Sequence, residues 1–470
     1  MPQSRNSVDN SEKIDESTNN SSNALATEDF ANIDDVAEKK LVKKLDLRII
    51  PLVTLLYTLS FLDRVNIGNA KLAHLERDLN LAGNEYNWSL GIFFVGYILF
   101  EIPSNMMLIK VRPSIWISSL MIVWGVIMIT MAFVQNFTHL MITRFFLGIF
   151  ESGLFPGVVF YITRWYKKSE QNYRIGLFFS GATIAGAFNG LLAYAITNLN
   201  GKFGFSGWRW LFLIDGAATV IIAFFSYFLI SDYAETVSWL TEDERKLAID
   251  RLRRDVGHTH TTHFDKHQVR QAFKDLIYGF ILLFACYFIF FFFFRSDHLI
   301  SQLLSTPPFV LGCISTISIA KLSDRTGVRS PYLIFSLSIA IIGYSILLVP
   351  NISTALKYTG VCIVGFGAFP TIPTTLAWIT NNLAGDSKRA VGCAMAIAFG
   401  NIGGVVSAQL YKSSDAPDYK TGHSAALSLF AVAILITLTQ CCLLKRANKY
   451  KIERPEMFLK GSNNDATHLG

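Results

Sequence analysis

Five charged side chains lie within long apolar stretches of this sequence. They are Asp63, Arg64, Glu101, Arg144 and Glu151. A charged side chain costs a few kcal/mol near the centre of a bilayer, so it usually faces a polar cavity or a charged partner. An arginine binds a carboxylate through two parallel hydrogen bonds, and an acid beside it can exchange a proton. The residue types therefore predict either an anion site coupled to proton movement or structural ion pairs between helices.

The spacing of these residues places them on common helix faces. Arg144 and Glu151 are seven positions apart, and Tyr57, Ser60 and Arg64 follow a similar pattern. Such spacing aligns side chains along one face of an α-helix. If the two faces meet, they form a polar, positively biased pocket that contains two titratable acids.

Composition indicates that this chain is a membrane protein. Its 470 residues are 51% hydrophobic and only 16% charged, with a mean hydropathy of +0.37, whereas soluble domains carry about 25% charged residues. The net charge of +7 comes from short basic clusters between apolar runs, which excludes a continuous nucleic-acid-binding patch. The spans hold no metal motif and no pair of nucleophile and base, so we expect neither a cofactor nor an enzyme. Four histidines between His258 and His267 favour a solvated linker over a metal site.

Apolar runs that are long enough to cross a bilayer recur along the chain. A transmembrane helix needs about 20 mostly apolar residues. Lys and Arg concentrate in alternate connecting segments, and because such residues stay on the cytoplasmic side, both termini are expected there. We expect twelve spans, at 48–68, 88–110, 114–134, 139–163, 174–198 and 210–231, and then at 276–294, 299–322, 331–349, 356–380, 390–411 and 422–444.

A charged segment divides these spans into two sets of six. We expect a disordered cytoplasmic tail (1–45), an N-terminal six-helix bundle (46–232), a cytoplasmic linker (233–275), a C-terminal six-helix bundle (276–446) and a second tail (447–470). Thr241, followed by three acids, predicts a short helix within the linker. Gly153-Leu154-Phe155-Pro156 recurs as Gly367-Ala368-Phe369-Pro370. The fold class is therefore an all-α membrane protein with two pseudo-symmetric bundles around a central cavity.

Motifs spread along the chain resemble those of the major facilitator superfamily, and within it the fungal allantoate permease branch of the anion:cation symporters. In the first half they are FLDRVNIGNAK (61–71), GYILFEIPSNMMLIKVRPSIW (96–116), RFFLGIFESGLFPG (144–157) and GWRWLFLIDG (207–216). In the second half they are LLSTPPF (303–309), LSDRTGVR (322–329) and DAPDYKTGH (415–423).

This resemblance implies a role for several residues. Asp63 and Glu151 match the acids associated with proton coupling, and Arg64 matches the arginine associated with the anionic substrate. Asp324, Arg325 and Arg329 match the superfamily's loop signature for the inward gate. From their positions in the spans, Tyr57, Arg144 and Asn401 join Arg64 as candidate substrate-binding residues, although Asn401 also fits close helix packing and Glu101 fits either helix packing or function.

The expected function is secondary active transport. It would be proton-coupled uptake of a small organic anion, either a vitamin carboxylate such as nicotinate or pantothenate or an allantoate-like nitrogen source. The expected partners are the anion, a proton and the lipid bilayer, without nucleic acid, and we expect a monomer. We expect a multi-pass protein of the plasma membrane, with the endoplasmic reticulum or another internal membrane as the alternative.

The region of the seventh span departs from the family pattern. Phe290 to Phe294 run directly into Arg295-Ser296-Asp297-His298, so the span and the outer loop after it are shorter than in relatives. A nineteen-residue span barely crosses a bilayer of ordinary thickness. The alternative function is therefore a non-transporting or degenerate transporter-like nutrient sensor.

Overall fold

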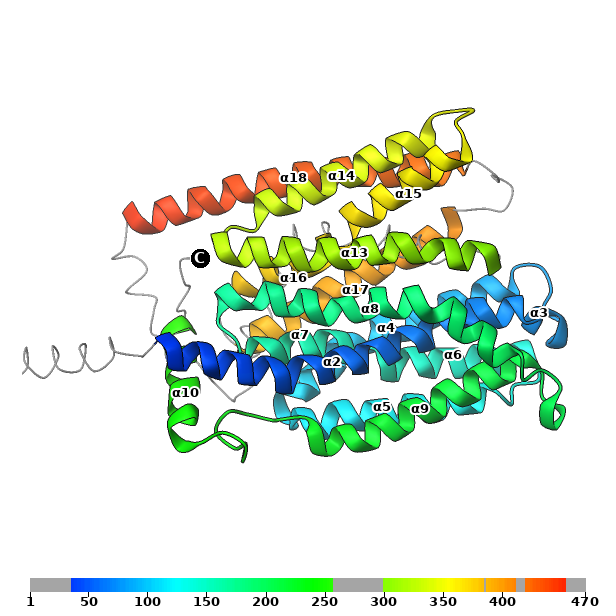
Figure 1. Cartoon of the computed structure of the whole chain (residues 1–470), viewed down its shortest axis with the longest axis horizontal. Coiled ribbons are helices and arrows are strands. Elements are labelled where there is room, and N and C mark those ends of the chain that lie inside the picture. Colours follow the sequence, from blue (N-terminus) through cyan, green and yellow to red (C-terminus); the bar gives the residue numbers. More distant parts are fainter. Residues whose placement is uncertain (1–34, 257–298, 384–385, 411–418, 454–470) are drawn as a thin grey trace, which may run out of the picture.

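The computed structural model describes residues 35–256, 299–383, 386–410 and 419–453, and this part of the chain contains helices and no strands. Long helices run side by side in one elongated bundle (Figure 1). Within the described residues, nine helices or continuous helix pairs are long and apolar enough to cross a membrane. The architecture is that of a polytopic helical membrane protein, as the hydropathy pattern predicts.

The helices of the first half correspond to the six expected spans. The first is α2 (Asp35–Leu72), which the short α3 (Leu75–Asp78) follows. Helix α2 begins earlier than residue 48 because Leu41 and Leu45 are buried against the bundle and extend its apolar face. The other spans are α4 (Glu85–Lys110), α5 (Pro113–Met131), α6 (Phe137–Glu151) continued by α7 (Leu154–Thr163), α8 (Lys168–Thr197) and α9 (Gly207–Leu229).

Helices cover five of the six spans expected in the second half, and three of them are among the nine that are long and apolar enough to cross a membrane. The expected span 276–294 lies outside the described residues, as do the four linker histidines. These helices are α13 (Leu299–Thr326), α14 (Ser330–Leu348), α15 (Thr354–Ala368) continued by α16 (Thr371–Asn381), α17 (Asp386–Leu410) and α18 (Lys420–Glu453), of which α14, α15 with α16, and α18 meet the criterion of length and hydropathy.

The repeated Gly-x-Phe-Pro motif marks a break in one span of each half. The α6–α7 span breaks at Ser152 and Gly153, and the α15–α16 span breaks at Phe369 and Pro370. A side chain at Gly153 would collide with Ser104 of α4, so the first break also allows a close helix contact. The internal repeat therefore corresponds to the same structural feature in both halves.

Two glycines bring α4 and α6 into backbone contact. A side chain at Gly148 would collide with the carbonyl oxygen of Phe93, and one at Gly96 would collide with the carbonyl oxygen of Phe145. Small residues allow this approach in a bilayer, where apolar side chains gain little from leaving lipid. The contact fixes the faces of α4 and α6 that carry Phe93, Arg144 and Glu151.

Helix α10 (Glu242–Val256) packs across one end of the bundle, which we call the linker end (left in Figure 1). Its first turn is capped as predicted, because Thr241 Oγ1 accepts a hydrogen bond from the Glu244 N–H while the Glu244 carboxylate accepts one from the Thr241 N–H. Lys44 Nζ of α2 lies 2.6 Å from Glu244 Oε2, and Arg251 is paired with Glu170 of α8. The linker helix is thus tied to two spans of the first half.

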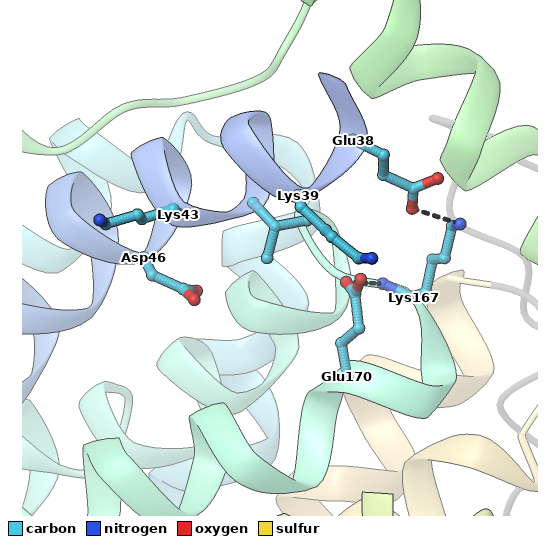
Figure 2. Close-up of a pocket in the computed structure, with 7 residues that line it drawn as sticks. Glu38, Lys39, Lys43, Asp46, Lys167 and Glu170 are labelled. Atoms are coloured by element: carbon cyan, nitrogen blue, oxygen red, sulfur yellow. Dashed lines mark hydrogen bonds and ion pairs between the residues drawn. The ribbon is translucent and has the colours of Figure 1, made fainter. Parts of the chain in front are cut away.

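The starts of α2 and α8 are also joined directly at the linker end. Lys167 Nζ lies 2.5 Å from Glu38 Oε1, and the Lys167 N–H donates to the Glu170 carboxylate (Figure 2). Arg174 of α8 forms two hydrogen bonds of 2.8 Å with the carboxylate of Asp46. These contacts order the first turns of α2, which hydropathy alone assigns to a disordered tail.

Candidate functional site

A buried ion pair joins α2 to α6 in the interior of the first half. Arg64 donates to Glu151 Oε1 from Nη2 at 2.7 Å and from Nε at 3.1 Å. The Ser60 hydroxyl donates to the same oxygen at 2.7 Å, whereas Glu151 Oε2 has no hydrogen-bond partner among the described residues. The Arg64 side chain is 9% exposed and that of Glu151 is fully buried. The face of α2 that carries Ser60 and Arg64 therefore meets the face of α6 that carries Glu151.

Arg144 lies beside this pair as a second buried cation. Its guanidinium carbon is 4.9 Å from the centre of the Phe93 ring, and that of Arg64 is 5.4 Å from the same ring. Arg64 also lies 4.9 Å from the ring centre of Tyr97. The two guanidinium groups therefore share an aromatic partner, which attracts both cations.

Arg144 has few polar contacts for a buried guanidinium. The residue is 2% exposed, its Nη1 has no hydrogen-bond partner among the described residues, and its Nε makes a long contact of 3.5 Å with the Ser89 carbonyl oxygen. No described carboxylate forms an ion pair with it. The cluster of Arg64, Arg144 and Glu151 thus holds two cations and one carboxylate.

Asp63 makes its hydrogen bonds on a different side of α2. Its Oδ2 accepts from Trp124 Nε1 of α5 at 3.1 Å and from Thr219 Oγ1 of α9 at 3.0 Å. Successive residues on a helix of 3.6 residues per turn point about 100° apart, so Asp63 and Arg64 face different neighbours. A pocket that contains both acids does not form, because Asp63 is hydrogen-bonded to α5 and α9 whereas Glu151 is paired with Arg64.

A second polar contact lies close to Asp63 between α2 and α9. Asn66 donates to Asp215, and Asn69 donates to the Asn66 side chain at 3.2 Å. Asp215 belongs to the GWRWLFLIDG stretch, and its position in that stretch does not by itself indicate this contact. Asp63 and Asn66 are three positions apart in the sequence, so they lie on the same face of α2, and this face contacts α9.

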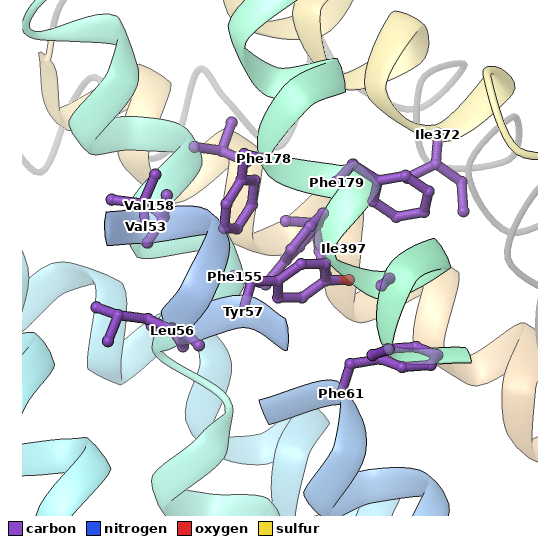
Figure 3. Packing of buried hydrophobic residues seen from close by; sticks show 14 of the residues in the cluster. Val53, Leu56, Tyr57, Phe61, Phe155, Val158, Phe178, Phe179, Ile372 and Ile397 are labelled. Carbon is purple, nitrogen blue, oxygen red and sulfur yellow. The ribbon is translucent and has the colours of Figure 1, made fainter. Parts of the chain in front are cut away.

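Tyr57 belongs to an aromatic cluster rather than to a polar wall. Its ring centre lies 4.6 Å from that of Phe178 and 5.0 Å from that of Phe155. Ile372 of α16 and Ile397 of α17 belong to the same buried cluster (Figure 3). Tyr57 therefore lies where side chains from both halves meet, two turns along α2 from Arg64.

Asn401 forms a contact between the two halves. Its Nδ2 lies 3.5 Å from Glu101 Oε2, and both residues are buried, between α17 and α4. Asn105, one turn beyond Glu101, donates to the Ala390 carbonyl oxygen at 2.7 Å. Asn401 is expected from the sequence either to bind substrate or to allow close helix packing, and this arrangement agrees with helix packing. Glu101 belongs to the same interface between α4 and α17.

The predicted gate residues lie at the linker end. Arg329 Nη1 donates to Asp324 Oδ1 at 3.1 Å, and Asp324 Oδ2 accepts from the Tyr173 N–H of α8 at 2.7 Å. Arg329 also donates to the Lys168 carbonyl oxygen at 2.7 Å. These contacts join the halves at the linker end, whereas Arg325 is exposed and makes no such contact.

Asp324 lies beyond the expected span 299–322, at the edge of the bundle. Burial raises its pKa from 3.8 to about 6, while Arg329 and the Tyr173 N–H act in the opposite direction. Desolvation thus outweighs the attraction of the arginine, so Asp324 binds a proton more readily than an exposed aspartate does.

Comparison with known proteins matches most of the chain to one family. The model of the Major Facilitator Superfamily matches residues 53–408. The MFS transporter prlL of Fungal sp. (strain NRRL 50135) is 36% identical over 430 residues, which cover 86% of each chain. The high-affinity nicotinic acid transporter of Saccharomyces cerevisiae is 29% identical, over 88% of this chain and 79% of its own.

A solved structure has the same overall arrangement. The proton:xylose symporter XylE, bound to 6-bromo-6-deoxy-D-glucose, aligns with a TM-score of 0.60 over 84% of this chain and 95% of its own, at 13% identity. At this identity the likeness concerns the fold.

Proposed function

The chain belongs to the Major Facilitator Superfamily and is a membrane transporter, and from this premise we propose that it takes up a small organic monocarboxylate together with a proton. The first candidate substrate is nicotinate, because a relative that covers most of the chain is a nicotinic acid transporter. Pantothenate and allantoate-like anions are the next candidates. We assign uptake to the plasma membrane, with an internal membrane as the alternative.

The observation that carries this proposal is the cationic excess around Arg144. A buried guanidinium without a carboxylate partner is costly, and a negatively charged ligand would remove that cost. A carboxylate placed between Arg64 and Arg144 would accept charge-assisted hydrogen bonds from both.

Proton coupling follows from competition for Arg64. In the empty site Glu151 occupies this arginine as a carboxylate. A bound substrate carboxylate takes its place, and Glu151 then stays buried at lower cost when it takes up a proton. The proton and the anion would cross together as the two halves rock around the site, and the contact between Glu101 and Asn401 would have to break in this movement.

The proposal is tested with purified full-length protein in liposomes. With an inward proton gradient, [³H]nicotinate should accumulate above its equilibrium level, and Glu151→Gln should exchange nicotinate across the membrane without accumulating it. Asp63→Asn is compared with it: because this residue lies apart from the cation cluster, the variant should bind nicotinate with unchanged affinity. Accumulation that is unchanged in Glu151→Gln would reject the coupling role of Glu151.

The nutrient sensor remains the competing function. It rests on the short seventh span, which lies outside the described residues. A protein that binds nicotinate with high affinity but neither accumulates nor exchanges it would favour the sensor.

A further inference from the structure

A basic chamber lies at the linker end, away from the proposed transport site. This cavity of about 620 Å³ is enclosed by the α4–α5 turn, the end of α7, the segment after α9 and helix α10. Such a volume falls in the range of small-molecule sites, which is about 300–1,000 Å³. Its charged lining consists of Lys110, Arg112, Arg164, Arg253, Asp232 and Glu235.

The charges of the chamber favour an anion. Four basic side chains converge there from three separate elements, against two acids. One of the acids, Asp232, already accepts hydrogen bonds from the N–H and hydroxyl of Ser114, at 2.8 and 3.0 Å. Arg164 stacks on Phe160 and Tyr233, which holds its guanidinium at the chamber wall. Arg112 and Arg253 are exposed to solvent.

The height of the chamber identifies the source of the anion. Lys110 is the last residue of one candidate span, Arg112 precedes the next, and Arg164 directly follows a third. Asp232 follows a fourth span, which ends at Leu229. The chamber therefore lies where the membrane-crossing helices end, at the level of the lipid headgroups.

We propose that this chamber binds the phosphate-bearing headgroup of an anionic membrane lipid. Basic pockets between membrane-spanning helices recognise such headgroups, because the phosphate oxygens accept hydrogen bonds from several cations while the acyl chains stay in the bilayer. Because α10 contributes Ile249, Leu252 and Arg253, the bound lipid would hold the linker helix against the ends of α4, α5 and α7. This role is independent of the transported substrate.

Native mass spectrometry of the purified full-length protein tests the proposal. The protein is titrated with dioctanoyl phosphatidic acid, dioctanoyl phosphatidylcholine and inorganic phosphate. Phosphatidic acid should bind in preference to phosphatidylcholine, and phosphate should not displace it. Displacement by phosphate at similar concentrations would assign the chamber to a soluble anion, and equal binding of the two lipids would exclude recognition of charge; either result overturns the proposal.

Paired variants locate the site. Each basic residue near a membrane surface contributes about fivefold to the binding of an anionic lipid, so Arg112→Gln with Arg253→Gln should weaken phosphatidic acid binding roughly 25-fold. Lys40→Gln with Lys246→Gln is the matched control, because both lysines are exposed and lie outside the chamber. Equal affinities in the two double variants would refute the assignment.

Weaker binding in a variant could also result from misfolding, so a variant that is expected to bind more tightly is tested as well. Glu235→Gln removes an acid of the chamber lining and should tighten phosphatidic acid binding by up to about fivefold. Unchanged or weaker binding in this variant would also count against the proposal.

Discussion

Substitution of the two buried arginines of the candidate site by methionine should change the stability of the protein by different amounts. Arg64→Met removes two of the three hydrogen-bond donors to Glu151 Oε1 and leaves the carboxylate with the Ser60 hydroxyl alone. Breaking a buried ion pair by removing one partner costs about 3–5 kcal/mol. The free energy of unfolding of the empty protein should fall by that amount.

Arg144→Met should leave the stability of the empty protein nearly unchanged. The substitution removes a buried Nη1 without a described partner, and an unpaired buried donor costs about 1–3 kcal/mol. It also removes the stacking of Arg144 on Phe93, which contributes at most about 2 kcal/mol, although a methionine sulfur retains part of that contact. These effects nearly cancel, so unfolding should stay within about 1 kcal/mol of the unsubstituted protein.

Substrate binding should be weaker in both variants. Hydrogen bonds to a charged group contribute about 1.5–3 kcal/mol, so Arg144→Met should weaken nicotinate binding roughly 10- to 150-fold. Titration with SDS in mixed micelles measures the free energy of unfolding, and scintillation proximity with [³H]nicotinate measures affinity. A loss of several kcal/mol in Arg144→Met, or an unchanged affinity, would show that Arg144 is a structural residue and would refute the anion site.

Three further predictions concern other parts of the molecule. Gly148→Ala should separate α4 from α6, because the new side chain would collide with the Phe93 carbonyl oxygen, and the yield of folded protein in size-exclusion chromatography should fall sharply. The control is Gly91→Ala on α4, whose side chain would have no neighbour within 4 Å and which should fold normally. Because the pKa of Asp324 is raised to about 6, the unsubstituted protein should lose up to ~3 kcal/mol of stability as pH rises from 4 through 6. Thermal unfolding measured over this pH range should show no such loss in Asp324→Asn. The same dependence of stability on pH in both proteins would contradict the prediction. Arg251→Met should detach α10, since Arg251 pairs with Glu170 and lies 3.8 Å from Glu38, and limited proteolysis should cleave the linker helix faster than in Lys246→Gln.

The membrane architecture could be predicted because it depends on local properties. A span must satisfy its backbone hydrogen bonds internally and cover about 30 Å of hydrocarbon, so length and hydropathy alone locate it. The described spans begin and end near the predicted positions, and the Gly-x-Phe-Pro repeat marks both helix breaks. The start of α2 could not be predicted in this way, because its first turns are held by ion pairs with distant residues such as Lys167 and Arg174.

For the candidate site, the sequence predicts only which side chains share one face of a helix. The spacing on α2 and on α6 predicts which residues share a face of each helix, but it leaves open whether the two faces meet; the structure pairs Arg64 with Glu151. The sharing of Phe93 by two arginines depends on the backbone contact between α4 and α6, which no periodicity within a single helix reveals. The surroundings of Asp63 depend likewise on which helices pack against its side of α2.

The separation of Asp63 from Arg64 restricts the way in which both acids could serve proton coupling. Glu151 competes directly with an anion for Arg64, whereas Asp63 is hydrogen-bonded to α5 and α9 within the same half. A proton on Asp63 would therefore act on the anion site only through a change in the rotation or tilt of α2. Because Trp124 and Thr219 donate to the carboxylate, protonation weakens the attachment of α2 to α5 and α9. The two roles predict different effects on the equilibrium binding of nicotinate. Asp63→Asn should leave the affinity unchanged, because Asp63 would act only through helix movement. Glu151→Gln should raise the affinity, because it frees Arg64 from a competing carboxylate.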